Sequence, residues 1–427
     1  MPMTSSFLRG PAAVQQLCAL AACRPLLAVA IDPAARRGAC PQVVAVGDAQ
    51  TQLLIDAPST PGLGEALAAL PRLGAYDAKA VVHALQRSWP GRAAARWGCI
   101  KLCEQLLLQG AAAPLQLEAI AGRYGCPPPA DIDQGLAAMQ AHVAALSALL
   151  GRQQQALQQA GMQRVSRLEA AAVLAVARME AHGMPLQRGA WSAVARRNAQ
   201  ALQQTQQRLG QHIGQQARGP KRAFDLTQDS ELRAALQACG LPARSVRRAA
   251  LAELPDPWGK LLVQLRTQSK LQAAYGESFL AHLGDDGRVH PTFEQIGAST
   301  GRMACRSPNL QAMVKDTPHR SCFRPAPGRV FVVADYNACE LRILADMSAD
   351  PVFVDAFARG EDVHARVASL LFERPVSRSE RPDLRAVAKV VSFGLAYGMG
   401  QAALARTLRC SPAHAADLLL RYHRAFP

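Results

Sequence analysis

The sequence predicts an α/β domain followed by a longer region that is mainly helical. Three short apolar runs of β type come first, PLLAVAID, QVVAVGD and TQLLID, and amphipathic helical patterns follow them. Beyond residue 150 the apolar residues recur mostly at helical spacing, until strand-like runs appear at the start of RVHPTFEQIG and in FVVAD. Strands followed by helices in the first part are typical of an α/β domain.

The composition allows several domains and favours a polyanionic partner. The 427 residues are enough for two or three domains with cores of their own. The formal net charge of +16 favours nucleic acid as the simplest partner. However, 41 of the 48 basic residues are arginines and alanine is abundant, which a GC-rich coding sequence would also produce. We interpret the eleven cysteines as reduced core residues, with metal binding as the alternative.

No segment is expected to enter a membrane. No apolar run reaches the length of a membrane span. The N-terminus lacks a basic start followed by an apolar core and a cleavage site, so no signal peptide is expected. PLLAVAID fits a first strand better, and we expect a cytoplasmic protein.

The N-terminal α/β domain is expected over residues 20–150. After the three strand runs the helical patterns are GLGEALAAL, DAKAVVHAL, IKLCEQLLL and LQLEAIAGRYG. The following stretch is predicted to be helical as far as the breakers Gly183 and Pro185. RNAQALQQTQQRLGQHIGQQA then continues as a long polar helix, because its Leu and Ile spacing stays helical.

One predicted helix near the C-terminus carries a stripe of functional side chain types. In RAVAKVVSFGLAY, Arg385, Lys389, Phe393 and Tyr397 follow one another at four-residue steps. Each step advances about 400°, so the four side chains form one slowly turning stripe. Two cations can hold a triphosphate and an aromatic ring can stack on a base, whereas the plainer interpretation is a solvated helix with two core aromatics. Upstream, Asp335 stands where the apolar run FVVAD stops, which is a usual position for a metal-binding carboxylate.

Three segments resemble the family A DNA polymerases, the DNA polymerase I group. DYNACELR resembles their first polymerase motif, RAVAKVVSFGLAYGMG their R-xxx-K-xxx-FG-xx-YG motif, and TGRMACRSPNLQAM their TGRLSS-x-PNLQ segment. The resemblance covers residue 165 to the end well and the first 150 residues weakly. It implies an α+β polymerase domain with a helical thumb over 165–290 and a partial palm and fingers over 291–427. It also implies that residues 20–150 form a 3′–5′ exonuclease-like α/β domain of RNase H-like fold.

The exonuclease-like domain lacks most of the carboxylates that such chemistry places around two metal ions. By resemblance, the D-x-E motif keeps only Asp32, because Ala34 takes the second acidic position. AYDAKAVVHAL resembles HNAKFD-xxx-L with Val81 in place of the Asp, and the Asp of the last motif falls on Gln140. We therefore predict an exonuclease-like fold without exonuclease activity, unless the loose alignment has misplaced an Asp.

The resemblance also implies contacts with primer–template DNA. Lys270 lies in SKLQAAYGESF, which would touch the DNA backbone, although an ordinary basic helix surface fits equally well. Arg302 would reach the minor groove at the primer terminus, and Asn309 and Gln311 would support nearby duplex contacts. Tyr397 would occupy the template-base position until the fingers close.

Further residues would form a nucleotide site. By resemblance, Arg385 and Lys389 would neutralise the β- and γ-phosphates of an incoming dNTP. Phe393 would stack near the base or sugar, and His364 in EDVHARVASLLF is a candidate phosphate contact. Glu340 would be a steric gate that selects deoxyribonucleotides, while its plainer interpretation is a carboxylate favoured at a helix N-terminus.

Asp335 and Lys389 are the candidate catalytic residues. By resemblance, Asp335 and the backbone carbonyl of Tyr336 would hold two Mg²⁺ ions that bridge the primer 3′-oxygen and the triphosphate. The family places a second metal carboxylate in a later H-D-E motif, which this chain does not contain. The chain ends at Pro427 in RYHRAFP, which resembles the family's Y-F-xx-YP, so we expect either a fragment of a longer protein or a truncated product.

We therefore predict a template-directed DNA polymerase of family A type that acts in replication or repair as a monomer. The primer 3′-OH would attack the α-phosphate of a dNTP and release pyrophosphate. The alternative is a catalytically incompetent remnant that binds primer–template or dNTP, and the missing second Asp supports it. A stand-alone exonuclease is a third class, against which the missing carboxylates argue.

Overall fold

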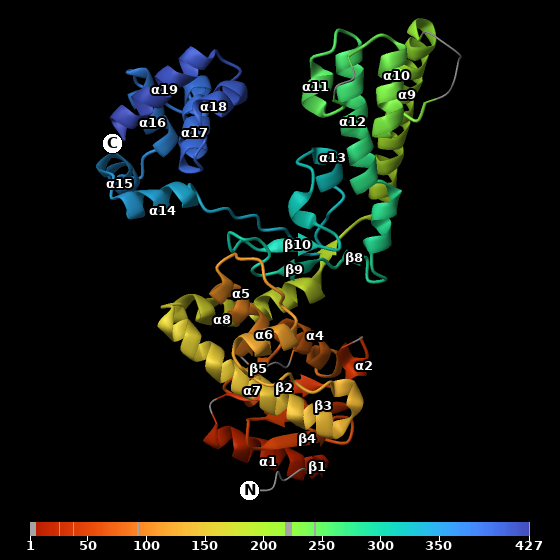
Figure 1. The fold of residues 1–427 in the computed structure, drawn as a ribbon, viewed down its shortest axis with the longest axis vertical. Coiled ribbons are helices and arrows are strands. Elements are labelled where there is room, and N and C mark those ends of the chain that lie inside the picture. The colour runs from red at the N-terminus through yellow and green to blue at the C-terminus, as the bar shows by residue number, and fades with distance from the viewer. Residues whose placement is uncertain are drawn as a thin grey trace. The chain divides into compact units, whose positions relative to one another are not determined.

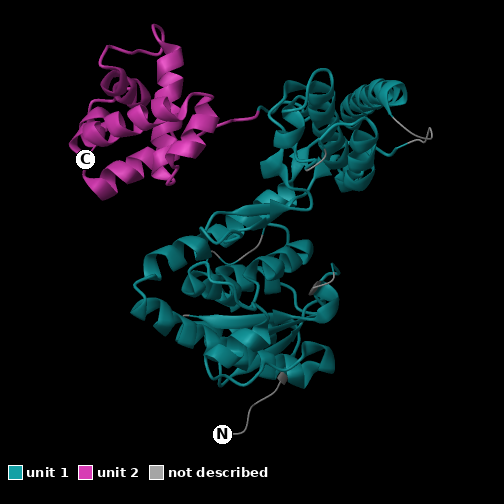
Figure 2. Cartoon of the chain, turned by 45° about the horizontal axis from the view of Figure 1, so that its top comes forward, with its two compact units in different colours: residues 1–330 teal, residues 331–427 magenta. Residues whose placement is uncertain are grey.

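The structure is a computed structural model that describes residues 6–24, 26–36, 38–91, 94, 96–217, 224–242 and 245–426. The chain divides into two compact units, Met1–Val330 and Phe331–Pro427, which have different colours in Figure 2. The domain boundaries predicted near residues 150, 165 and 290 all fall inside the first unit and stay predictions. Pro427, where the sequence suggested a family motif, lies outside the described residues.

Among the described residues of the first unit, six strands form a mixed sheet in the order β1-β4-β3-β2-β5-β6 (Figure 1). β3 runs antiparallel to both β2 and β4, and the other neighbours are parallel. The three predicted apolar runs form β2, β3 and β4. The strands are β1 (Ser6–Leu8), β2 (Leu27–Ile31), β3 (Val43–Gly47), β4 (Gln52–Asp56), β5 (Leu73–Ala75) and β6 (Trp97–Cys99).

Helices cover both faces of this sheet, because its strands are apolar on both sides. On β2, Leu27, Val29 and Ile31 belong to one buried cluster, and the intervening Ala28 and Ala30 belong to another. The first cluster also includes residues of α1, α3, α4 and α8, and the second includes residues of α5, α6 and α7. These helices are α1 (Gly10–Cys23), α3 (Leu63–Ala69), α4 (Ala78–Ser88), α5 (Ile100–Leu108), α6 (Leu117–Arg123), α7 (Leu136–Gln159) and α8 (Gln163–His182).

The rest of the first unit is a helical region with a small base. α8 ends before Gly183, where φ is +60°, as the sequence predicted. The prediction of one unbroken helical stretch before Gly183 is wrong, because α7 ends at Gln159 and α8 begins at Gln163, and Gly161 between them has φ +68°. Two long helices then pack together around Leu209, Leu262 and Leu265, and Trp191 stacks on Phe279 at the base with ring centroids 4.4 Å apart. The elements are β7 (Met184–Pro185), α9 (Arg188–Gln216), α10 (Asp229–Ala238), α11 (Arg248–Ala252), α12 (Trp258–Tyr275), β8 (Arg288–Val289), β9 (Thr292–Glu294), β10 (Ala304–Arg306) and α13 (Thr317–Arg320).

The second unit is helical throughout its described elements. Its core is formed by one apolar cluster that includes Leu341, Phe353, Leu371, Val391 and Tyr422. The helices are α14 (Cys339–Ser348), α15 (Pro351–Ala358), α16 (Val363–Phe372), α17 (Pro382–Ala396), α18 (Gln401–Leu408) and α19 (Pro412–Ala425). Over the described part of the chain, no helix has both the length and the hydrophobicity needed to span a bilayer.

The prediction of a strand that ends at Asp335 is wrong. Residues 329–336 have irregular backbone, and Val332 and Val333 are 88% and 92% exposed. An extended segment becomes a strand only when a neighbouring strand satisfies its N–H and C=O groups. None of the described strands pairs with this segment, so its apolar sequence alone does not produce a strand.

Candidate functional site

Helix α17 carries the predicted stripe on the side that packs against α16. Pro382 occupies its first turn, where the missing N–H of proline has no cost. Ala388 and Val391 are fully buried in the core, which fixes the rotation of the helix. Arg385 and Phe393 are consequently half-buried, while Lys389 is exposed.

Arg385 forms a two-point ion pair with Asp362, the N-cap residue of α16. Its Nε and Nη2 donate to the two carboxylate oxygens of Asp362 at 2.8 and 3.1 Å. Asp362 also accepts the Ala365 N–H and so caps α16. Partial burial raises the pKa of Asp362, but the hydrogen bonds from Arg385 and Ala365 outweigh it, and the net pKa is lowered. The pair holds the guanidinium in one orientation and does not use its Nη1.

His364 lies on α16 next to this ion pair and packs beside Phe393. The side chain is 9% exposed, and the two ring centroids are 5.5 Å apart. Burial, followed by the nearby Arg385, lowers the pKa of His364, so the imidazole is neutral near pH 7. Its Nδ1 has no hydrogen-bond partner within the described chain. Lys389 Nζ lies 5.9 Å from the centroid of the Phe393 ring, so the structure gathers four of the predicted nucleotide-binding residues on one face.

Tyr397 and Glu340 lie at exposed helix ends. Tyr397 is the C-cap residue of α17 and is 62% exposed, and the following Gly398 has φ +73° and ends the helix. Glu340 is exposed in the first turn of α14, where the helix dipole favours a carboxylate.

Asp335 and Tyr336 lie in the irregular segment that precedes α14. Both are exposed, Tyr336 to 86%. Within the described residues no group of three or more His, Cys, Asp or Glu side chains is arranged to hold a metal ion. Asp335 is therefore not part of a group of three or more candidate ligands among the described residues.

Two of the four DNA-binding candidates in the first unit line one cavity. Lys270 on α12 and Asn309 border a cavity of about 990 Å³ together with Arg248 and Arg266. The Asn309 side chain accepts the Ala312 N–H, which fixes the short turn after β10. Both arginines add positive charge to the cavity lining, and the sequence analysis did not identify them as candidates.

The remaining two DNA-binding candidates, Arg302 and Gln311, lie on either side of β10 in the sequence and are linked by a hydrogen bond next to Arg302. Arg302 is exposed in the turn that joins β9 to β10. The Gln311 side chain donates to the Met303 carbonyl at 3.2 Å, immediately next to Arg302. Through this bond the turn and the segment after β10 are held together.

The positions expected for exonuclease carboxylates have structural roles. Asp32 follows β2 and accepts the backbone N–H groups of Ala35, Gln42 and Val43, which makes it a structural carboxylate. Val81 is buried in the apolar core. Gln140 donates to the carbonyl of Gln52 at the start of β4, which the strand register places at the other end of β2 from Asp32.

Asp362 is the main functional candidate that the sequence analysis missed. A signal was present, because an Asp that directly precedes a helical run predicts an N-cap. Its second role, as the partner of Arg385, depends on the packing of α16 on α17 and has no local signature.

These features place a cluster of two cations, a buried histidine and an aromatic ring on one unit, and a cavity lined by basic residues on the other. The sequence model described as DNA polymerase family A matches residues 192–427, more than half of the chain, so the chain belongs to DNA polymerase family A. The chain is 37% identical over 176 residues to DNA polymerase I of Treponema pallidum, covering 40% of this chain and 18% of that protein. It is 38% identical over 149 residues to DNA polymerase I of Aquifex aeolicus, covering 34% of this chain and 25% of that protein. The matched part is thus a quarter or less of the length of these relatives.

A solved structure of similar fold is the polymerase domain of Pol1 from M. smegmatis, in complex with DNA primer–template and dNTP. The TM-score is 0.82 over 99% of this chain and 76% of that chain, at 24% sequence identity. This likeness shows the fold, which is mixed α/β and mostly helical.

Proposed function

We propose that this chain takes part in template-directed DNA synthesis, in which a primer 3′-OH attacks the α-phosphate of a dNTP and pyrophosphate is released. The observation that carries the proposal is the face between α16 and α17, where Arg385, Lys389, His364 and Phe393 meet. Membership of DNA polymerase family A supports it, as does the fold shared with a polymerase domain that was solved with primer–template and dNTP.

On the nucleotide side, the two cations would bind the β- and γ-phosphates. Arg385 is already oriented by Asp362 and would use its Nη1, while Lys389 is exposed and reaches the same face. The neutral His364 would donate one hydrogen bond to a phosphate oxygen, and Phe393 would stack beside the base or sugar. Phosphoryl transfer depends mainly on positioning and charge stabilisation, which is what these side chains can supply.

Two further residues would complete this site. Glu340 would act as the gate against a 2′-OH, and Tyr397 would occupy the template-base position before closure. Both are exposed at helix ends, which leaves room for a nucleotide or a template strand.

On the DNA side, Lys270 would contact the duplex backbone, which makes binding independent of sequence and sensitive to salt. Arg302, Asn309 and Gln311 would contact the minor groove near the primer terminus. Minor-groove acceptors occur at every base pair, so such contacts test pairing geometry without selecting a sequence.

Mg²⁺ is the cofactor that this reaction would require, with Asp335 and the Tyr336 carbonyl as proposed ligands. The described residues gather no group of three candidate side chains, and Mg²⁺ at such sites usually takes one or two carboxylates together with substrate phosphates. Because Asp335 is the one carboxylate among the proposed ligands, a second candidate function is that the chain binds primer–template and dNTP without transferring a nucleotide.

Primer extension by the full chain distinguishes the two candidates. The assay uses a 5′-labelled primer–template, four dNTPs and Mg²⁺, with Asp335→Asn as the control against a contaminating polymerase. Extension that is lost in Asp335→Asn supports the polymerase. Binding of dNTP to the primer–template complex without extension supports the second candidate. If neither extension nor dNTP binding is observed, both candidate functions are contradicted.

We also propose that the chain has no 3′–5′ exonuclease activity. Its action as a monomer, its cytoplasmic location and a role in replication or repair stay predictions.

A further inference from the structure

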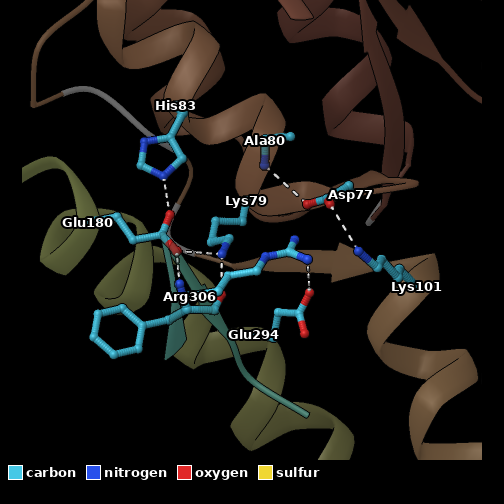
Figure 3. Close-up of polar contacts among 9 residues, drawn as sticks. Asp77, Lys79, Ala80, His83, Lys101, Glu180, Glu294 and Arg306 are labelled. Carbon is cyan, nitrogen blue, oxygen red and sulfur yellow. Dashed lines mark hydrogen bonds and ion pairs between the residues drawn. The ribbon is translucent and has the colours of Figure 1, made fainter. Parts of the chain in front are cut away.

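The hairpin formed by β9 and β10 is held from the N-terminal α/β domain. Figure 3 shows the centre of this contact, where α4, α8 and β9 meet around Glu180. The hairpin matters for function because the turn between its strands carries Arg302. The contacts come from residues that are far from the hairpin in the sequence.

Glu180 is a buried carboxylate that joins three partners. One oxygen accepts from Lys79 Nζ at 2.6 Å and from the backbone N–H of Phe293 at 2.5 Å. The other oxygen lies 2.7 Å from Nε2 of His83. Lys79 also donates to the Phe293 carbonyl. Side chains of α4 and α8 therefore bind both the backbone N–H and the backbone C=O of Phe293 in β9. A satisfied buried network of this kind rigidifies the elements that it joins.

Other charged groups at this contact are paired within the protein. A cavity of about 530 Å³ lies here, and Lys101 and Arg306 line it. Lys101 pairs with Asp77 at 3.7 Å and Arg306 pairs with Glu294 at 2.9 Å. Each of these two pairs lies within one side of the contact, so the link between the N-terminal domain and the hairpin runs through Glu180 and Lys79.

A second contact lies closer to Arg302. The Gln105 side chain on α5 donates to the Ile296 carbonyl at 2.7 Å. The next two residues of the hairpin, Gly297 and Ala298, both donate their N–H groups to the Arg302 carbonyl at 3.1 Å. The amide of Gln105 is therefore one residue away from the hydrogen bonds that close the Arg302 turn.

The third contact is backbone against backbone. Gly110, just after α5, has φ +86°, and a Cβ built on it would overlap the carbonyl oxygen of Ser299. Ser299 lies in the middle of the Arg302 turn. Only glycine allows the N-terminal domain to approach the turn this closely.

We propose that the N-terminal α/β domain acts as a brace for DNA binding, with Gly110 and Gln105 as positioning residues for the turn that carries Arg302. The proposal rests on the DNA-binding role of Arg302 in the proposed function. It gives the domain a task that requires no nuclease chemistry. It also predicts that Gly110→Ala and Gln105→Ala alter primer–template binding mainly through Arg302.

The test compares two glycine substitutions in the full chain. Gly110→Ala introduces a Cβ that must displace Ser299, whereas Gly62→Ala imposes a similar backbone strain, at φ +81°, with open space around it. Affinity for a fluorescent primer–template is measured by anisotropy, with each substitution made in the wild-type chain and in Arg302→Ala. We expect Gly110→Ala to weaken binding about fivefold or more, and Gly62→Ala to change it less than about twofold.

The double variants decide whether the effect passes through Arg302. In the Arg302→Ala background, Gly110→Ala should cause a much smaller loss, because the turn then no longer positions the Arg302 side chain. Equal effects of the two glycine substitutions, or additive effects of Gly110→Ala and Arg302→Ala, would overturn the brace. A wild-type chain that does not bind primer–template would instead overturn the proposed function. If Arg302→Ala leaves the affinity for primer–template unchanged, the DNA-binding role proposed for Arg302 is contradicted.

A milder variant covers the case in which Gly110→Ala fails to fold. Gln105→Ala removes only the hydrogen bond to Ile296, and Gln116→Ala is its control because Gln116 is exposed in the same domain. The same pattern is expected, namely a loss of binding with Gln105→Ala that is much smaller in the Arg302→Ala background. Unchanged binding with Gln105→Ala in a chain that binds DNA counts against the brace.

Discussion

Asp362 and Arg385 lie 23 residues apart in the sequence and form a two-point ion pair between the N-cap position of α16 and the first turn of α17. The side chains are 32% and 20% exposed, so solvent screens the pair only in part. A bidentate arrangement fixes the direction of the guanidinium as well as its position. The protein itself therefore holds the Arg385 guanidinium in one orientation.

The first prediction concerns the strength of this pair. Asp362→Asn and Arg385→Gln, made singly and together, should show a coupling free energy of unfolding of about 1 kcal/mol. Asparagine is also a good N-cap residue, so the substitution isolates the ion pair from the cap. The measurement is urea unfolding of the four chains. The exposed pair Asp355 and Arg359 is the control, for which we expect less than about 0.5 kcal/mol. Strictly additive effects at Asp362 and Arg385 would contradict a fixed pair.

The second prediction concerns Lys389. Lys389→Ala should weaken dNTP binding about tenfold or more, since a hydrogen bond to a charged group contributes roughly 1.5–3 kcal/mol. Primer–template affinity should change less than about twofold, because the residue is assigned to the triphosphate. Both affinities are measured on the same preparation, with Lys260→Ala as the control at an exposed lysine of the first unit. Equal losses of dNTP and DNA binding would count against the nucleotide role.

The third prediction concerns Asp32, which would be catalytic in an active exonuclease. Asp32→Ala should destabilise the chain by about 1–3 kcal/mol, because three backbone N–H groups lose their acceptor. Asp32→Asn should cost less, since its remaining oxygen can still accept. Urea unfolding gives the stabilities, and a 3′-labelled single strand with Mg²⁺ gives the nuclease activity. Degradation by the wild-type chain that disappears in Asp32→Ala would show a working nuclease and refute the structural assignment.

The fourth prediction concerns pH. Burial raises the pKa of Glu180, but hydrogen bonds from His83, Lys79 and the Phe293 N–H outweigh it, and the pKa lies below its ordinary value of 4.5. The carboxylate thus contributes stability above pH 4.5, and this contribution is lost as the pH falls through the lowered pKa of the folded state. The melting temperature of the wild-type chain should therefore decrease more steeply below that pH than the melting temperature of Glu180→Gln. Glu118→Gln, at an exposed glutamate, should follow the wild type, and parallel curves for all three would contradict the prediction.

Elements whose signals are local were predictable from the sequence. The apolar runs of the first domain form β2, β3 and β4, and the breaker at Gly183 ends α8. The four-residue steps from Arg385 through Lys389 to Phe393 predicted one helical face, and α17 presents it. These features depend on residues a few positions apart, which a sequence pattern records directly.

The contacts between these elements depend on the tertiary structure. Asp362 binds Arg385, and Glu180 binds Lys79 and Phe293, across separations of 23, 101 and 113 residues that no periodicity reports. The run before Asp335 has the composition of a strand but is irregular, because a strand exists only with a partner for its backbone groups. The physical reason is the same in each case. Local sequence sets the preferred backbone and the face of each helix, whereas ion pairs, buried networks and strand pairing depend on groups that the fold alone brings into contact.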